Sequence, residues 1–157
     1  MLNASPLIVL ARAGLEDLLL KLPELVVVPQ AVETEIQAGP AGDPARRALT
    51  AGKFSIIYAP LREEILTWDF GRGETAVLSY ALSNPGWIAI LDDRAARTCA
   101  RSYSIPYKCT LAVVILAKQE GEIDSAANVM RSLQAAGLRL DDAVIRQALK
   151  QTVGEDW

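Results

Sequence analysis

An acidic side chain lies on the apolar side of a helix that the sequence predicts over residues 31–38. Successive residues of a helix are about 100° apart, so Val32 and Ile36 define the side that faces the core. Glu35 falls within this apolar arc, whereas Glu33 falls on the polar side. We therefore expect Glu35 to point toward the core and Glu33 to point toward water.

A second predicted helix, over residues 74–83, repeats this arrangement. Its apolar arc consists of Val77, Leu78, Ala81 and Leu82, and its polar stripe consists of Thr75, Ser79 and Ser83. Glu74 lies near the middle of the apolar arc, after a Gly71-Arg72-Gly73 run whose glycines let the backbone approach another group closely. Glu74 also suits the positive end of the helix dipole, but that role does not require it to face the core.

A third acidic position is the Asp92-Asp93 pair, which follows a predicted strand over residues 88–91. One aspartate can cap the next helix, and the other is then free. Burying an unpaired carboxylate costs several kcal/mol, so three inward acidic positions require cations. Arginine is one candidate, but Mg²⁺ or Mn²⁺ is better suited to converging carboxylate oxygens.

The composition limits the chemistry that such a site can perform. The chain has 157 residues, 51% of them apolar, and it contains no histidine. Serine–histidine and cysteine–histidine catalysis and histidine-ligated metals are therefore excluded. Cys99 and Cys109 form no CxxC motif and are predicted to be buried thiols. No apolar run is long enough to span a membrane, and we expect a cytoplasmic protein.

The net charge of −3 argues against a surface coated in positive charge for nucleic acid. A local basic stripe remains, because Arg94, Arg97 and Arg101 share one face of the helix predicted after Asp93. Such a stripe beside a metal site is suited to phosphate groups. An ordinary solvated helix face is the alternative.

Short β-rich runs alternate with helical runs, which is typical of a parallel sheet covered by helices on both faces. The predicted strands are Leu25–Val28, Ser55–Tyr58, Ile88–Leu91 and Ile105–Lys108, with a stub at Met1–Leu2. The predicted helices run from Ser5 to Gly14 and from Asp43 to Gly52, and over Leu15–Leu22, Ala31–Ala38, Glu74–Ser83, Arg94–Tyr103, Thr110–Gln119, Asp124–Ala136 and Asp141–Gln151. Ligands of such sheets bind outside the carboxyl ends of the strands, where Asn3 and Asp92-Asp93 would lie.

Five segments, in this order and spacing, resemble the PIN domain. They are LNASPLIVLARAG (2–14), VVVPQAVETEI (26–36), GRGETAVLSYAL (71–82), ILDDRAARTCA (90–100) and TLAVVILAKQEG (110–121). The family includes small Mg²⁺/Mn²⁺-dependent ribonucleases and the toxins of VapBC-type toxin–antitoxin pairs. The resemblance implies one three-layer α/β/α domain over residues 1–157, with a central, mainly parallel sheet of about four to five strands.

The resemblance also assigns site residues. The four acidic positions of a PIN site fall on Asn3, Glu35, Glu74 and the Asp92-Asp93 pair, of which spacing favours Asp93 without excluding Asp92. These residues would bind the metal ion, and the acids among them would be catalytic. Ser5 and Thr110 match polar residues near the site. Asn3 departs from the family, because active PIN nucleases usually carry aspartate there.

The resemblance therefore predicts a ribonuclease that leaves a 5′-phosphate and a 3′-hydroxyl, with Arg94, Arg97 and Arg101 on the RNA backbone. The alternative is a catalytically weakened module that binds nucleic acid or a protein. A receiver or phosphatase is disfavoured, because only Asn3 follows the first strand. The predicted partners are RNA, an antitoxin protein and a second copy of the chain. The amphipathic helices near the C-terminus would pack on the core or form that partner surface.

Overall fold

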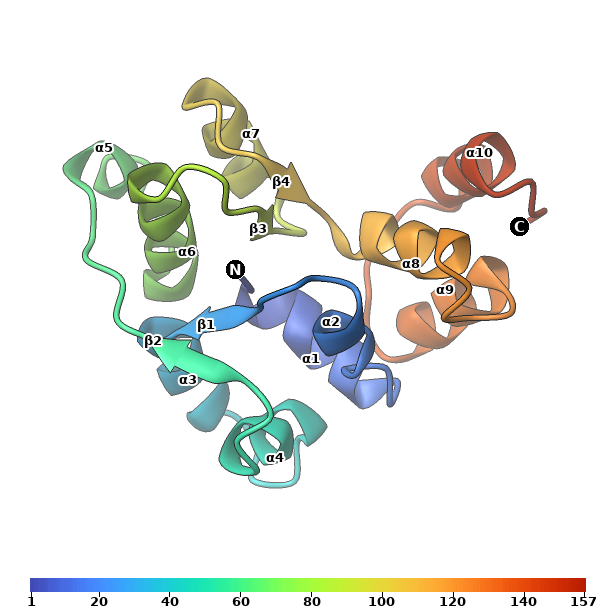
Figure 1. Cartoon of the computed structure of the whole chain (residues 1–157), viewed down its shortest axis with the longest axis horizontal. Helices are drawn as coiled ribbons and strands as arrows, with labels where there is room; N and C mark the ends of the chain where they lie inside the picture. The colour runs from blue at the N-terminus through green and yellow to red at the C-terminus, as the bar shows by residue number, and fades with distance from the viewer.

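The strands of the chain form two parallel pairs. In the computed structural model, which describes all residues from Met1 to Trp157, β1 (Val27–Pro29) pairs with β2 (Ser55–Ile57), and β3 (Ala89–Ile90) pairs with β4 (Tyr107–Lys108) (Figure 1). The helices are α1 (Ala4–Arg12), α2 (Leu18–Lys21), α3 (Gln30–Gln37), α4 (Pro44–Thr50), α5 (Glu63–Leu66), α6 (Arg72–Ser83), α7 (Arg94–Ser102), α8 (Thr110–Gln119), α9 (Ala126–Ala135) and α10 (Asp142–Thr152). No helix combines the length and the apolar character needed to cross a bilayer.

The segment before α1 connects the two strand pairs. Leu2 forms a parallel bridge with Ile90, and its N–H donates to the carbonyl oxygen of Val27 at 3.0 Å. The N–H of Ile90 in turn donates to the carbonyl oxygen of Met1 at 2.9 Å. The predicted α/β alternation is confirmed, but a single sheet of four to five strands is not. The connecting segment forms an isolated bridge at Leu2 and no regular strand between the two pairs.

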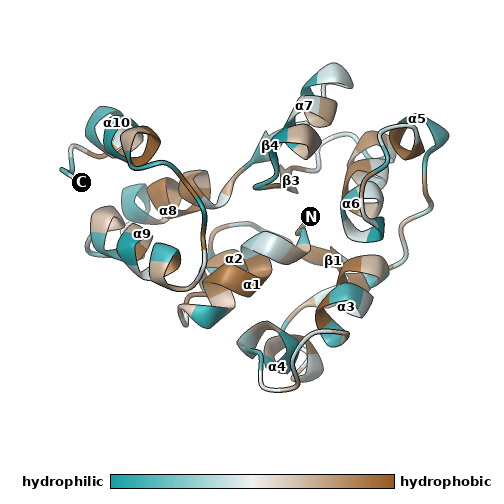
Figure 2. Cartoon of the chain, turned by 180° about the vertical axis from the view of Figure 1, so that it is seen from behind, coloured by the Kyte–Doolittle hydropathy of each residue, from teal (hydrophilic) through white to brown (hydrophobic).

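The three C-terminal helices pack on one another. Helices α8, α9 and α10 lie together at one end of the molecule, away from α3 and α6 (Figure 1). Figure 2 shows that α1 is apolar along much of its length, whereas α10 has hydrophilic residues on its outer side. In α9 and α10 the side chains of Met130, Leu133, Ile145 and Leu149 are buried. This confirms the core-packing interpretation for these residues, while Val144 stays exposed.

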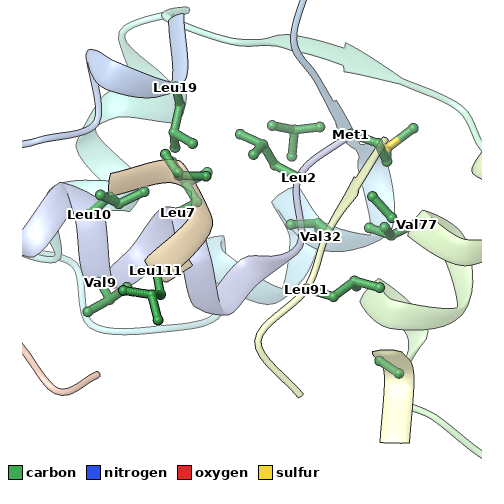
Figure 3. Packing of buried hydrophobic residues seen from close by; sticks show 14 of the residues in the cluster. Met1, Leu2, Leu7, Val9, Leu10, Leu19, Val32, Val77, Leu91 and Leu111 are labelled. Atoms are coloured by element: carbon green, nitrogen blue, oxygen red, sulfur yellow. The ribbon is translucent and has the colours of Figure 1, made fainter. Parts of the chain in front are cut away.

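One hydrophobic cluster of 34 buried residues joins the N-terminal segment to most of the helices. Figure 3 shows Met1 and Leu2 in this cluster with Val32 from α3 and Val77 from α6. A fully buried side chain of this size contributes about 1.5–3 kcal/mol relative to exposure. The core therefore fixes the ends of the strands against α3 and α6, and so positions the polar residues that follow the strands.

The predicted polar stripe of α6 is wrong for two of its three residues. Thr75 and Ser79 are buried, and only Ser83 is exposed. The hydroxyl of Thr75 donates to the carbonyl oxygen of Gly71 at 3.0 Å, and that of Ser79 accepts from the backbone N–H of Arg62 at 3.0 Å. Small hydroxyl groups satisfied in this way allow the segment that carries α5, a helix that the pattern did not predict, to pack on α6.

The two cysteines are free thiols, but only one is fully buried. Cys99 lies in the core, where burial raises the pKa of its thiol to about 11. Cys109 is half-buried, because it immediately precedes α8 at the edge of the core. The prediction of two buried thiols is therefore confirmed for Cys99 and wrong for Cys109.

The amino group of Met1 is buried beside the core. It donates a hydrogen bond to the carbonyl oxygen of Ile88 at 3.2 Å, and burial lowers its pKa from 8.0 to about 6. An apolar cavity of about 480 Å³, lined in part by Met1, Leu19 and Trp87, lies next to it. Water is thus largely replaced by apolar side chains around a group that is normally charged.

Because burial lowers the pKa of this amino group, we expect the free energy of unfolding of a chain beginning at Met1 to increase from pH 6 to pH 8. The unfolded chain binds a proton up to about pH 8 and the folded chain only up to about pH 6, so unfolding takes up a proton in this interval. The free energy of unfolding should rise by about 2 kcal/mol across it. The interval is informative because no histidine titrates there. Urea unfolding at several pH values measures the rise, and acetylation of the α-amino group should abolish it. An equally steep rise after acetylation would assign the effect to other groups.

Candidate metal centre

Asn3 directly follows Leu2, whose bridge to Ile90 connects the two strand pairs. Its side chain is only 4% exposed, and its Nδ2 lies 3.4 Å from Oε1 of Glu74, to which it donates. Although Asn3 precedes α1, it makes no capping hydrogen bond to that helix. Its Oδ1 is buried and has no hydrogen-bond partner. A buried acceptor without a partner costs about 1–3 kcal/mol, so this oxygen is a candidate ligand atom.

Glu74, in the first turn of α6, is half-buried beside Asn3. Its pKa is raised, first by burial and then by the negative charges of Asp93 and Glu35, while the hydrogen bond from Asn3 acts in the opposite direction. Three carboxylates from α3, α6 and the end of β3 therefore influence one another electrostatically. No lysine or arginine forms an ion pair with any of them.

Glu35 reaches this region in a different way from the one predicted. It is exposed, and Glu33 is half-buried, so the predicted burial of the two glutamates is wrong. The carboxylate of Glu35 nevertheless lies against α6, because a Cβ atom on Gly73 would collide with Oε2 of Glu35. The close packing of α3 on the start of α6 places Glu35 at the rim of the core, and Gly73 makes room for it there.

Both carboxylate oxygens of Asp92 accept hydrogen bonds from Thr110. Its Oδ1 accepts from the backbone N–H of Thr110 at 2.8 Å, and its Oδ2 accepts from the hydroxyl of Thr110 at 2.6 Å. Thr110 is fully buried at the first position of α8. Both oxygens of Asp92 are therefore engaged in joining the end of β3 to the start of α8.

Asp93 caps α7 and is exposed. Its Oδ1 accepts from the backbone N–H of Ala96 at 2.8 Å, and its Oδ2 makes no hydrogen bond within the chain. Because its charge, and not that of Asp92, raises the pKa of Glu74, Asp93 is the member of the pair that faces the other acids. The sequence left open which aspartate is the metal ligand, and the preference for Asp93 stays a prediction.

The arginines of α7 differ in their surroundings. Arg97 is half-buried and donates from Nη1 to the carbonyl oxygen of Asp92 at 2.7 Å, and Arg101 donates from Nη2 to the hydroxyl of Thr98 at 3.2 Å. Arg94 is exposed, and its guanidinium has no partner within the chain. Arg94 is thus the member of the predicted stripe with the most freedom to contact phosphate.

Ser5, in the first turn of α1, is exposed. Its hydroxyl forms no hydrogen bond that ties it to Asn3 or to the acids. The predicted role of Ser5 beside the metal stays a prediction.

The candidate ligand atoms around Asn3 are of the type that a hard cation prefers, but the side chains that carry them do not converge on one point. They are all oxygens, one of them unpartnered and buried, and the acids lack a compensating cation. Mg²⁺ and Mn²⁺ prefer such ligands. However, no three acidic or cysteine side chains converge closely enough to form a metal site by themselves. The metal-ligand set of Asn3, Glu35, Glu74, Asp92 and Asp93 therefore stays a prediction.

A second cavity of about 480 Å³ adjoins Glu35, and the sequence patterns gave no indication of it. Its polar and exposed lining residues are Gln30, Thr34, Glu35, Tyr58, Leu61 and Arg72. The one feature of the sequence that could have indicated this cavity is Arg72 between two glycines, because glycines allow close approach of a ligand. Tyr58 lies just past β2, and only the folded chain brings it near α6.

Comparison with known proteins identifies the family. A family model described as a PIN domain matches residues 1–154, and the chain belongs to that family. The resemblance to the PIN domain is thereby confirmed, as is the α/β character of the fold. PIN domains are typically dependent on divalent metals and bind nucleic acid. No curated protein and no solved structure matches the chain significantly.

The hydrogen bonds of the two aspartates predict unequal effects of mutation on stability. Asp92→Ala leaves the buried N–H and hydroxyl of Thr110 without acceptors, so it should lower the free energy of unfolding by about 2 kcal/mol. Asp93→Asn keeps a good helix cap and should change it by less than about 0.5 kcal/mol. Urea unfolding in EDTA measures both values. Equal losses in the two variants would contradict the division of roles.

Proposed function

We propose that this chain is a ribonuclease that hydrolyses RNA phosphodiesters with Mg²⁺ or Mn²⁺ held by Asn3, Glu35, Glu74 and Asp93. The observation that carries the proposal is the buried, unpartnered Oδ1 of Asn3 beside Glu74, a half-buried acid that pairs with no cation of the chain. Membership of the PIN-domain family supports the same conclusion. The chemistry requires no histidine, in agreement with the composition.

The residues of the chain would divide the work as follows. A bound divalent ion supplies a Lewis acid that lowers the pKa of water and offsets charge on the phosphodiester. Glu74, Asp93 and Glu35 provide the negative charge that attracts the ion, and Oδ1 of Asn3 provides a neutral oxygen. Arg94 contacts the RNA backbone beside them. Asp92 is a positioning residue, because its hydrogen bonds to Thr110 hold the end of β3.

The wider proposal places this activity in a toxin of a toxin–antitoxin pair. In that case an antitoxin protein inhibits the chain, a second copy forms a homodimer, and the single domain over residues 1–157 acts in the cytoplasm. Only family membership supports these points.

A second candidate function is a PIN-like module that binds nucleic acid or a protein without cleaving it. Two observations favour it: Asn3 contributes no charge, and three acids do not converge on one point. Both would weaken metal binding. This candidate predicts a stable fold, with no cleavage of RNA at any Mn²⁺ concentration.

Removal of single charges tests the metal site. Glu74→Gln and Asp93→Asn should each weaken Mn²⁺ binding by about tenfold, because each takes one carboxylate from the site at little change in shape. Isothermal titration measures the affinity, and cleavage of a labelled RNA should fall in parallel. Glu120→Gln is the matched control, because Glu120 is exposed at the end of α8. Equal affinity in all four proteins would exclude the proposed site.

Introduction of a charge at position 3 tests how much the asparagine weakens metal binding. Asn3→Asp should raise Mn²⁺ affinity by about tenfold, since it adds a carboxylate to the ligands. In EDTA the same variant should be less stable than the wild type by about 1–3 kcal/mol, because a buried acid then faces Glu74 without a cation. Titration and urea unfolding measure the two effects. A variant that gains neither affinity nor activity would show that Asn3 does not limit the site.

A further inference from the structure

We propose that the cavity between α3, the segment after β2 and the start of α6 binds one nucleotide of single-stranded RNA, with its base on Tyr58 and its phosphate at Arg72. The cavity, of about 480 Å³, falls in the range of about 300–1,000 Å³ that is typical of small-molecule sites. The inference rests on the proposed ribonuclease function and names the part of the surface that holds the substrate.

Tyr58 provides an exposed aromatic surface at the rim of the cavity. It lies one residue beyond the carboxyl end of β2, and 76% of its surface is exposed. Its hydroxyl makes no hydrogen bond within the chain, and Leu61, also exposed, lies in the same lining. Packing therefore does not explain the position of the ring. Stacking of a base on an aromatic ring is the common way in which proteins hold single-stranded nucleic acid.

Arg72 provides a positive charge in the same cavity. It is the first residue of α6, it is exposed, and its guanidinium forms no ion pair or hydrogen bond within the chain. The carboxylate of Glu35 lies against Gly73 in the first turn of the same helix, so Arg72 is the group at this helix start that is available to an anion. An unpaired arginine that lines a cavity is suited to phosphate.

The lining of the cavity also includes a hydrogen-bonding group and one of the acids. The amide of Gln30 lines the cavity and has no partner in the chain, so it is available to the edge of a base. Glu35 lines the same cavity and also raises the pKa of Glu74. A nucleotide bound here would therefore place the adjoining phosphodiester near Glu74 and Asp93. A stacking ring, a free cation and a free amide favour a nucleotide over a peptide.

Binding of a 5′-labelled RNA hexamer in EDTA tests the subsite without cleavage. Tyr58→Ala should weaken binding by about tenfold, as expected for the loss of one stacked base, whereas Tyr58→Phe should stay within about twofold. Arg72→Gln should weaken binding and reduce the salt dependence by about one phosphate contact. Fluorescence anisotropy at several salt concentrations measures these values. The controls are Leu25→Ala and Arg146→Gln, which change exposed residues outside this cavity.

The inference is overturned if the wild type does not bind the hexamer, if Tyr58→Ala binds as the wild type does, or if the cavity takes up only a protein segment. Cleavage with Mn²⁺ separates this from the proposed function. RNA cleavage that depends on Glu74 but has the same KM and cleavage pattern in Tyr58→Ala would refute the subsite and leave the ribonuclease. RNA binding that depends on Tyr58, without any cleavage, would leave the subsite and refute the ribonuclease.

Discussion

The hydrogen bonds of Met1 and Leu2 to both neighbouring strands are the interaction on which the site depends. The Leu2 N–H reaches Val27 on one side, and the Met1 carbonyl accepts from Ile90 on the other. The β1–β2 and β3–β4 pairs have no other strand between them. These bonds and the packing of α6 on α3, β1 and β3 together hold α3 and the end of β3 in place. Asn3 follows directly, so its position between Glu74 and the strand ends is a consequence of the same pairing.

Two acids shielded from solvent, Asp43 and Glu74, have opposite electrostatic surroundings. Asp43, only 8% exposed, pairs with Arg12 at 2.8 Å and caps α4 through the N–H of Ala45. Its charge is therefore compensated inside the chain, as the cost of burial requires. Glu74 receives one amide hydrogen bond and is surrounded by further negative charge. This contrast shows that the chain can compensate an acid with arginine, and it supports an external cation at Glu74.

The sequence predicted the order and approximate bounds of nearly all elements, because strands and helices differ clearly in their apolar period. It predicted that Glu74 faces inward, but it misjudged Glu35, Thr75 and Ser79. A helical wheel assigns one buried side, whereas α6 is enclosed on several sides by segments distant in the sequence. The hydrogen bonds that distinguish Asp92 from Asp93 involve Thr110, eighteen positions from Asp92. A side chain's hydrogen-bond partner across the fold cannot be deduced from periodicity alone.

The amide at position 3 links the stability of the chain to its proposed activity. In the metal-free chain, Nδ2 of Asn3 partly offsets the charge of Glu74, which an aspartate would increase. The amide brings no charge to a bound ion, so the electrostatic attraction would come mainly from Glu74, Asp93 and Glu35. An RNA phosphate adds negative charge and oxygen ligands at the same place. Under the proposed function, the ion is therefore held more tightly with substrate than without it.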